Sequence, residues 1–163
     1  MVSVPPPARS PRAAPHGAPA RHEASLDEER FDDRVALFDA QGCIYEALSR
    51  EDRDLGLPAS IMGCSAHGMV QDRVAMLAKG VLTCRRDRLL RQVGNLRVRR
   101  AGELLRIDAG LVVYRSDEEG VSSLYMVARY EVDVADDGAR LAIRHMAVVV
   151  DSFGIDTMLA VPL

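Results

Sequence analysis

Apolar and polar positions along the chain predict two helices in its first half. Apolar residues recur at near-helical spacing over 26–39, and Ser25–Glu28 has the form of a capping box at the start of that segment. A second amphipathic helix is predicted from His67 to Lys79, with Gly80 at the position of a left-handed C-cap. The predicted buried stripe of this second helix consists of Val70, Val74, Leu77 and Val81.

The segment between the two helices is harder to interpret. Glycines and a proline interrupt residues 40–64, and no single period runs through them. The charged run Arg50–Asp54 predicts a solvated loop. Residues 82–92 are basic and equally ambiguous.

From Val93 onward, alternating apolar residues predict strands joined by tight turns. Strands are expected up to the turn at Ala101-Gly102, and then over 104–115, 121–134 and 139–151. The apolar faces of the two central strands are Leu105, Ile107, Ala109, Leu111 and Val113, and Leu124, Met126, Ala128, Tyr130, Val132 and Val134. Asp136-Asp137-Gly138 is a strong hairpin signal.

This order of elements indicates an α+β fold. Two helices followed by a meander of long strands form two layers around one core. Because long strands twist and curl, we expect the sheet to wrap around a helix as a cone.

The composition indicates one domain with an N-terminal tail. A chain of 163 residues fits a single domain, here 23–163. Residues 1–22 hold six of the eight prolines, three arginines and no acidic residue, so a mobile tail is expected. A polyproline ligand for a partner is the alternative reading of this tail.

Charge and cysteine content narrow the class of protein. The net charge of −3 argues against a nucleic-acid binder. No apolar run approaches the length needed to cross a bilayer, and prolines stand where a signal peptide would need an apolar segment. Three cysteines without close pairing favour a cytoplasmic protein over a secreted one.

Cys64-Ser65-Ala66-His67 is half of the motif that holds a Rieske [2Fe–2S] cluster. The other half would be C-x-H upstream, but Cys43-Ile44-Tyr45 carries a phenol where the second imidazole is needed. A Rieske centre requires two histidines on one iron. We therefore interpret these cysteines as buried residues and His67 as a helix-start residue.

Asp72 and Arg73 are adjacent on the second helix and therefore do not face each other. We expect each of them to form a structural ion pair with a residue of another element, and Arg73 to pair with a carboxylate of the sheet. Catalytic use of the two residues is the alternative.

His145, Asp108 and Tyr114 lie on different predicted strands, where a cone could gather them into a general-base pocket. A His145 that is hydrogen-bonded on a sheet face is the favoured reading. The arginines Arg85, Arg86, Arg88 and Arg91 lack nearby aromatics for base stacking and predict a solvated or protein-facing strip.

Several segments resemble the small (beta) subunits of bacterial aromatic-ring-hydroxylating dioxygenases. They are Leu26–Phe38, Asp72-Arg73, Gly94–Val98, Val112–Arg115, and the ending Asp151-Ser152 with Ile155–Leu163. The ending is similar to small subunits of oxygenases that act on terephthalate and other aromatic acids. The resemblance covers the chain from about residue 24 to its end. Three positions depart from the family: Arg34 replaces a usual tryptophan, and Leu90-Arg91 replaces a frequent Arg-His.

The resemblance implies a cystatin-like, nuclear-transport-factor-like cone, with N-terminal helices packed on a strongly curved antiparallel sheet. It also implies a three-plus-three hexamer with a large alpha subunit, served by ferredoxin and reductase proteins. The alpha subunit would hold the Rieske [2Fe–2S] cluster and the mononuclear iron, and this chain no cofactor and no catalytic residue. The residues assigned to a subunit interface or to C-terminal packing are Ile155, Asp156, Thr157, Pro162 and Leu163.

Two other functions remain open at this point. One is a stand-alone dehydratase, isomerase or cyclase that uses a pocket histidine and aspartate on the same cone fold. The other is a ligand-binding module without catalysis. The ending Ile155–Leu163 favours the oxygenase subunit, because a monomeric pocket enzyme has no need for it.

Overall fold

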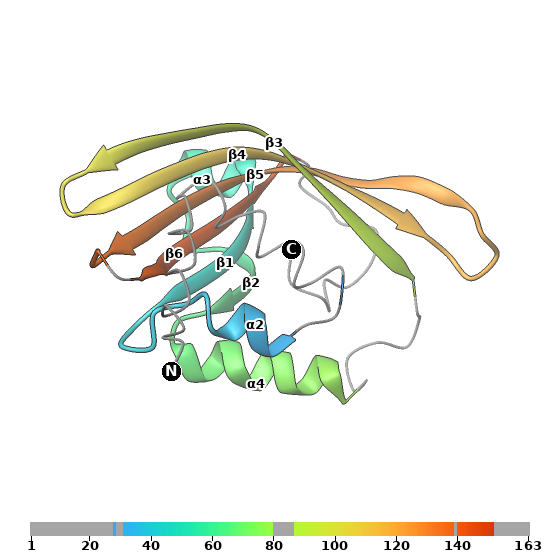
Figure 1. Cartoon of the computed structure of the whole chain (residues 1–163). Coiled ribbons are helices and arrows are strands. Elements are labelled where there is room, and N and C mark those ends of the chain that lie inside the picture. The colour runs from blue at the N-terminus through green and yellow to red at the C-terminus, as the bar shows by residue number, and fades with distance from the viewer. Residues whose placement is uncertain (1–27, 29–30, 80–86, 139, 152–163) are drawn as a thin grey trace, which may run out of the picture.

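The computed structural model describes residues 28, 31–79, 87–138 and 140–151, in which a curved sheet covers two of three helices, α2 and α4 (Figure 1). The helices are α2 (Phe31–Val35), α3 (Arg50–Leu55) and α4 (His67–Ala78). The strands are β1 (Ile44–Ser49), β2 (Ser60–Cys64), β3 (Arg88–Ala101), β4 (Leu104–Ser116), β5 (Ser122–Asp136) and β6 (Leu141–Val150). The predicted α+β class is confirmed.

The six strands form one sheet in the order β2-β1-β6-β5-β4-β3. All neighbouring strands are antiparallel except β1 and β6, which run parallel. The expected antiparallel sheet is therefore found in the β3–β6 meander and at β1–β2, and β1–β6 is the one parallel pair among the described strands. Four of the six residues of β1 are buried, on both faces of the strand. Such a strand shows no clean alternation, which is why residues 40–64 gave no readable pattern.

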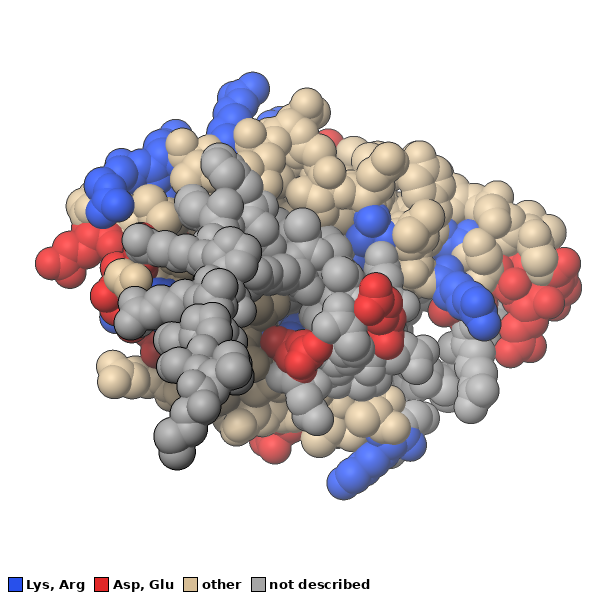
Figure 2. Space-filling view, in the orientation of Figure 1, with Lys and Arg blue, Asp and Glu red and all other residues tan. Residues whose placement is uncertain are grey.

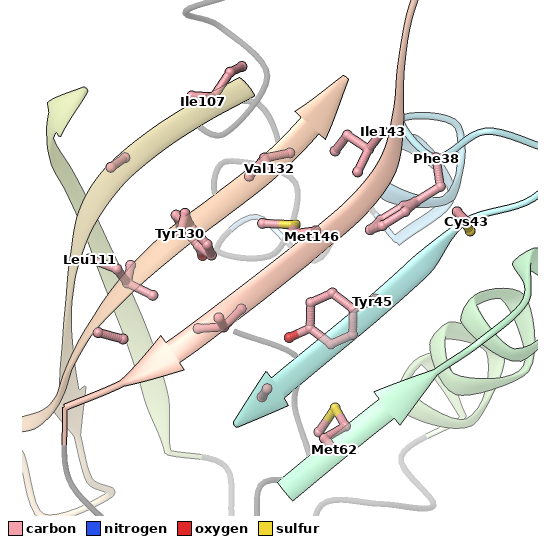
Figure 3. Packing of buried hydrophobic residues seen from close by; sticks show 14 of the residues in the cluster. Phe38, Cys43, Tyr45, Met62, Ile107, Leu111, Tyr130, Val132, Ile143 and Met146 are labelled. Carbon is pink, nitrogen blue, oxygen red and sulfur yellow. The ribbon is translucent and has the colours of Figure 1, made fainter. Parts of the chain in front are cut away.

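The core lies on the concave side of the sheet, above α2 and α4 (Figures 1 and 3). The predicted inward face of β4, from Leu105 to Val113, is fully buried, and so is the face of β5 from Met126 to Val134. Leu124 is an exception, because its side chain is 59% exposed. The register shifts between Val113 and Tyr114, and this bulge turns Leu124 to the opposite face.

The first predicted helix ends earlier than expected. α2 stops at Val35, and Phe38 instead forms a parallel bridge to Ile143 of β6. The amide of Ile143 donates to the Leu37 carbonyl at 2.8 Å. Residues 37–39 therefore pair with the edge of the sheet in an extended conformation instead of continuing the helix. The expected start of this helix lies outside the described residues.

The charged run predicted as a loop is helix α3. The hydroxyl of Ser49 accepts a hydrogen bond from the Asp52 amide at 3.0 Å and caps its start. Gly56 ends the helix in the left-handed conformation, at φ 65°. None of the residues of α3 is buried, so the expectation of a solvated segment was right although its conformation was wrong.

The second predicted helix is confirmed as α4, with Val70, Val74 and Leu77 buried. Lys79 is its C-cap, while Gly80 and Val81 lie outside the described residues. β3 begins at Arg88, earlier than the predicted Val93. It forms with β4 and β5 an arm beyond the helices, and Figure 2 shows acidic residues gathered at the arm's end, where 117–120 form the turn.

Candidate functional site

A buried arginine occupies the interior of the cone. Arg34 projects from α2 and is 1% exposed, which makes it the largest fully buried side chain among the described residues. Its guanidinium carbon lies 5.5 Å from the ring centre of Phe38 and 5.1 Å from that of Tyr45. These two rings meet edge to face, with their centres 6.3 Å apart. The guanidinium is therefore stacked on aromatic faces, an arrangement that stabilises a cation.

Three further strands contribute to the surroundings of Arg34: β5 with Tyr130, β2 with Cys64, and β3 with Arg91. Burial lowers the pKa of Arg34 from its usual value, and the like charge of Arg91 lowers it further. An arginine nevertheless remains protonated in a protein. The interior of the cone thus combines aromatic rings with positive charge.

Within the described part of the chain, nothing accepts a hydrogen bond from Nε or Nη2 of Arg34. In the sequence, Arg34 stands out only as a departure from the family's usual tryptophan. One signal was available: Arg34 lies four residues before Phe38, on the apolar face of the helix predicted over 26–39. An arginine on such a face either forms an ion pair with a carboxylate in the core or binds an anion.

The cysteines of the incomplete Rieske motif, Cys43 and Cys64, are buried free thiols beside this arginine. Cys64 on β2 is the register partner of Tyr45 on β1. The residue next to Cys64 across the strands is therefore the tyrosine that replaces the second histidine of the motif. Burial raises the pKa of the Cys43 and Cys64 thiols, whereas a cluster binds thiolates. No group of three or more His, Cys, Asp or Glu among the described residues is arranged to hold a metal ion.

The structure does not bring His145, Asp108 and Tyr114 together. Nε2 of His145 lies 2.9 Å from Oε1 of Glu46 on β1, on the face of the sheet opposite the core. Asp108 pairs instead with Arg99 at 3.2 Å, and Tyr114 is exposed on the arm. The favoured reading of His145 as a hydrogen-bonded residue on a sheet face is confirmed, and the general-base pocket is not formed.

Asp72 is exposed on α4, and Arg73 is half-buried there. Neither forms an ion pair with another described residue, so their structural pairing stays a prediction. Of the arginine strip, Arg88 is exposed and Arg91 is buried, so the solvated reading fails at Arg91. Arg85, Arg86 and the whole ending from Ile155 to Leu163 lie outside the described residues.

An apolar strip crosses the arm on the side away from the core. Leu90 of β3, Tyr114 of β4 and Leu124 of β5 are register partners in one row, and all three are exposed. Leu90 is one of the family departures noted above. Exposed apolar side chains grouped in this way are typical of surfaces that meet another protein.

Comparison with known proteins identifies the family. The family model described as the ring hydroxylating beta subunit matches residues 21–154. The chain belongs to the ring hydroxylating beta subunit family. Among the helices of the described residues, none is long and apolar enough to cross a membrane.

Individual relatives agree with this membership. The anthranilate 1,2-dioxygenase small subunit of Burkholderia cepacia is 27% identical over 146 residues, which cover 88% of each chain. A solved structure assigned as the beta subunit of an aromatic-ring-hydroxylating dioxygenase, from Novosphingobium aromaticivorans, is 26% identical with a TM-score of 0.78, over 90% of this chain and 92% of that one. A Nostoc punctiforme protein with a cystatin-like fold aligns at 17% identity and a TM-score of 0.56, over 82% and 86% of the two chains. The expected cystatin-like fold of this beta subunit is confirmed.

Proposed function

We propose that this beta subunit is the structural, non-catalytic partner of a large subunit that carries a Rieske cluster and a mononuclear iron. The single observation that carries this proposal is the family match over residues 21–154. The fold is consistent with it, because the inward faces of the strands build a packed core, and no group of possible metal ligands is found among the described residues. Oxygen chemistry would then take place on the large subunit.

We further propose that three copies of each subunit form a hexamer, which receives electrons from ferredoxin and reductase proteins. We propose that the ending Ile155–Leu163 packs either against the large subunit or against the rest of this chain. In this ending, Asp156 and Thr157 are flanked by apolar residues. Cys43 and Cys64 are buried free thiols, which fit a reducing cytoplasm.

Co-expression with the large subunit tests this proposal. Tagged full-length chain should retain the large subunit on an affinity column, at equal amounts of the two subunits. A chain that lacks 155–163 should lose it, because several apolar residues would no longer be buried. A chain that lacks 1–22 is the matched control and should retain it, since its proline, alanine and arginine content offers little to bury. A full-length chain that never retains the large subunit would contradict the proposal.

A stand-alone enzyme on the same cone has less support. Its catalytic histidine was to be His145, which is bonded to Glu46 on the outer face of the sheet.

A further inference from the structure

The outer side of the arm carries an exposed apolar patch. Leu90, Tyr114 and Leu124 form one row across β3, β4 and β5, and these residues are 62%, 39% and 59% exposed. In the next row, Val127 is 42% exposed and lies opposite the half-buried Val112. The patch is therefore continuous over three strands. A patch of this kind on a projecting arm is typical of a surface that binds another protein.

The end of the arm next to this patch is acidic. Glu118 and Glu119 lie in the turn 117–120 and are exposed, and no cation among the described residues pairs with either of them. The nearest exposed cation in the register is Arg88, opposite Ser116. Figure 2 shows acidic side chains gathered at this end of the molecule. A basic surface on another molecule would therefore be attracted to it.

The free edge of the sheet has the opposite charge. β3 is the last strand in the sheet order, and its 14 residues include five arginines and no acidic residue. Three of them, Arg97, Arg99 and Arg100, are exposed in the second half of the strand and form what we call the basic edge. Arg99 pairs with Asp108 at 3.2 Å, but no carboxylate among the described residues pairs with Arg97 or Arg100. Glu103 is the exposed acidic residue of the turn that follows.

One copy of the chain cannot bring the acidic turn and the basic edge together. The register places Arg97 opposite Asp108 and Arg100 opposite Leu105, whereas the acidic turn follows Ser116 at the other end of β4. At ~3.3 Å per residue, roughly 25–35 Å of β4 lies between the two regions. This distance is several times the reach of an exposed ion pair in salt. The two regions can therefore meet each other only through a contact between two copies.

The separation of the two charges favours a head-to-tail contact. Two arms that met end to end about a two-fold axis would bring their acidic turns near each other, and like charges that face one another weaken a contact. A head-to-tail contact instead places the acidic turn of one copy on the basic edge of the next. Such a contact repeats from copy to copy and closes into a ring where the rotation allows it. A ring of three copies is compatible with the proposed hexamer.

We propose that the end of the arm binds the basic edge of a second copy of this chain, head to tail. Glu118 and Glu119 face Arg97 and Arg100 across the contact. The apolar stems of these arginines cover the patch, and a guanidinium stacks on the ring of Tyr114. Closure into a ring of three rests on the proposed function, whereas the contact itself rests on the charges and the patch.

Charge reversal on the full-length chain, measured by light scattering and sedimentation without the large subunit, tests this contact. Wild type should self-associate into a species of three copies, and added salt should weaken the association. Glu118→Lys/Glu119→Lys should weaken it by about tenfold or more, because it places cations against the basic edge. Arg97→Glu/Arg100→Glu should weaken it to a similar extent. The variant that combines all four substitutions should recover association, because it exchanges the two charges.

Two controls separate the contact from effects on charge and folding. Glu51→Lys/Asp54→Lys, at exposed positions of α3, makes the same change in net charge as the reversal of the acidic turn and should associate as wild type does. In solutions dilute enough to dissociate wild type, all variants should unfold in urea as wild type does, because the substituted residues are exposed. Leu90→Ser should weaken association and likewise leave unfolding of the dilute chain unchanged.

Three results would overturn the proposal. One is a wild type that stays monomeric at every concentration, including the case in which charge reversal stops capture of the large subunit, because the arm would then bind that subunit. Another is association that reversal at either end leaves unchanged, since the arginines would then only protect the free edge of β3 from strand pairing. The third is a combined variant that does not recover. A chain that self-associates as expected but never retains the large subunit would contradict the proposed function and leave this contact standing.

Discussion

Arg106 of β4 and Asp133 of β5 are direct register partners, joined by two hydrogen bonds of 2.8 Å each. The pair lies on the face of the sheet opposite the core. The hydrogen bonds that Arg106 donates to Asp133 raise the pKa of Arg106 above its usual value. The pair therefore fastens the two central strands at a point where the core does not reach.

A double-mutant cycle on this pair should reveal a coupling free energy of ~1 kcal/mol, because the geometry is bidentate and Asp133 is 17% exposed. Arg106→Ala, Asp133→Ala and the double variant would be unfolded in urea. The matched control is Arg99 with Asp108, where the arginine is 63% exposed. Its coupling should be within ~0.3 kcal/mol of zero. Equal coupling in the two cycles would contradict the role given to the Arg106–Asp133 pair.

The bulge in β5 predicts opposite results for two neighbouring apolar residues. Met126→Ala should lower the free energy of unfolding by ~2–5 kcal/mol, because Met126 is buried against the core. Leu124→Ala should change it by less than ~0.5 kcal/mol, because the bulge turns Leu124 outward. Chemical denaturation of the two variants measures both. If Leu124→Ala lowered the free energy of unfolding as much as Met126→Ala does, the bulge would be contradicted. Such a result would fit the uninterrupted strand that the sequence predicted.

Ser49 should stabilise the chain through the start of α3. Ser49→Ala removes the acceptor for the Asp52 amide and should lower the free energy of unfolding by ~1 kcal/mol. Ser60→Ala is the control, since Ser60 is exposed and its hydroxyl donates only to the half-buried carboxylate of Glu46. A Ser49 variant as stable as the Ser60 variant would show that the cap contributes nothing.

Acid should remove the stabilising effect of Asp39. The Gln41 amide and the Arg144 side chain hold the pKa of Asp39 below its usual value. A depressed folded pKa means that the stabilisation is complete above the unfolded value of ~4 and is lost as the pH falls through the folded one. Wild type should therefore exceed Asp39→Asn in stability at pH 6, and the gap should shrink toward pH 2. A gap that does not change with pH would contradict this account.

Much of the sheet could be predicted from the sequence, and the reasons are local. β4 and β5 alternate apolar and polar residues because one face of each is buried and the other is not. β1 could not be predicted, because Ala47, Leu48 and Ser49 are all buried and their pattern has no period. α3 was missed because its start depends on a serine cap and its end on Gly56, with no buried stripe to indicate a helix.

The surroundings of Arg34 could not be predicted either, for a different reason. They combine residues from α2, β1, β2, β3 and β5, which only the folded sheet brings together. His145 illustrates the same point, since its partner Glu46 is 99 positions away in the chain. The family resemblance, by contrast, depended on runs of consecutive residues, and the family match confirmed it.

The location of the iron tests the central claim most directly. Metal analysis and electron paramagnetic resonance would be carried out on this chain alone and on the complex with its large subunit. The chain alone should be colourless and contain no stoichiometric iron, and the complex should show a Rieske signal. That signal should survive Cys64→Ala and His67→Ala in assembled complexes, because the proposed function assigns the cluster ligands to the large subunit. A Rieske signal from this chain alone, or its loss in either variant with the complex intact, would contradict the account.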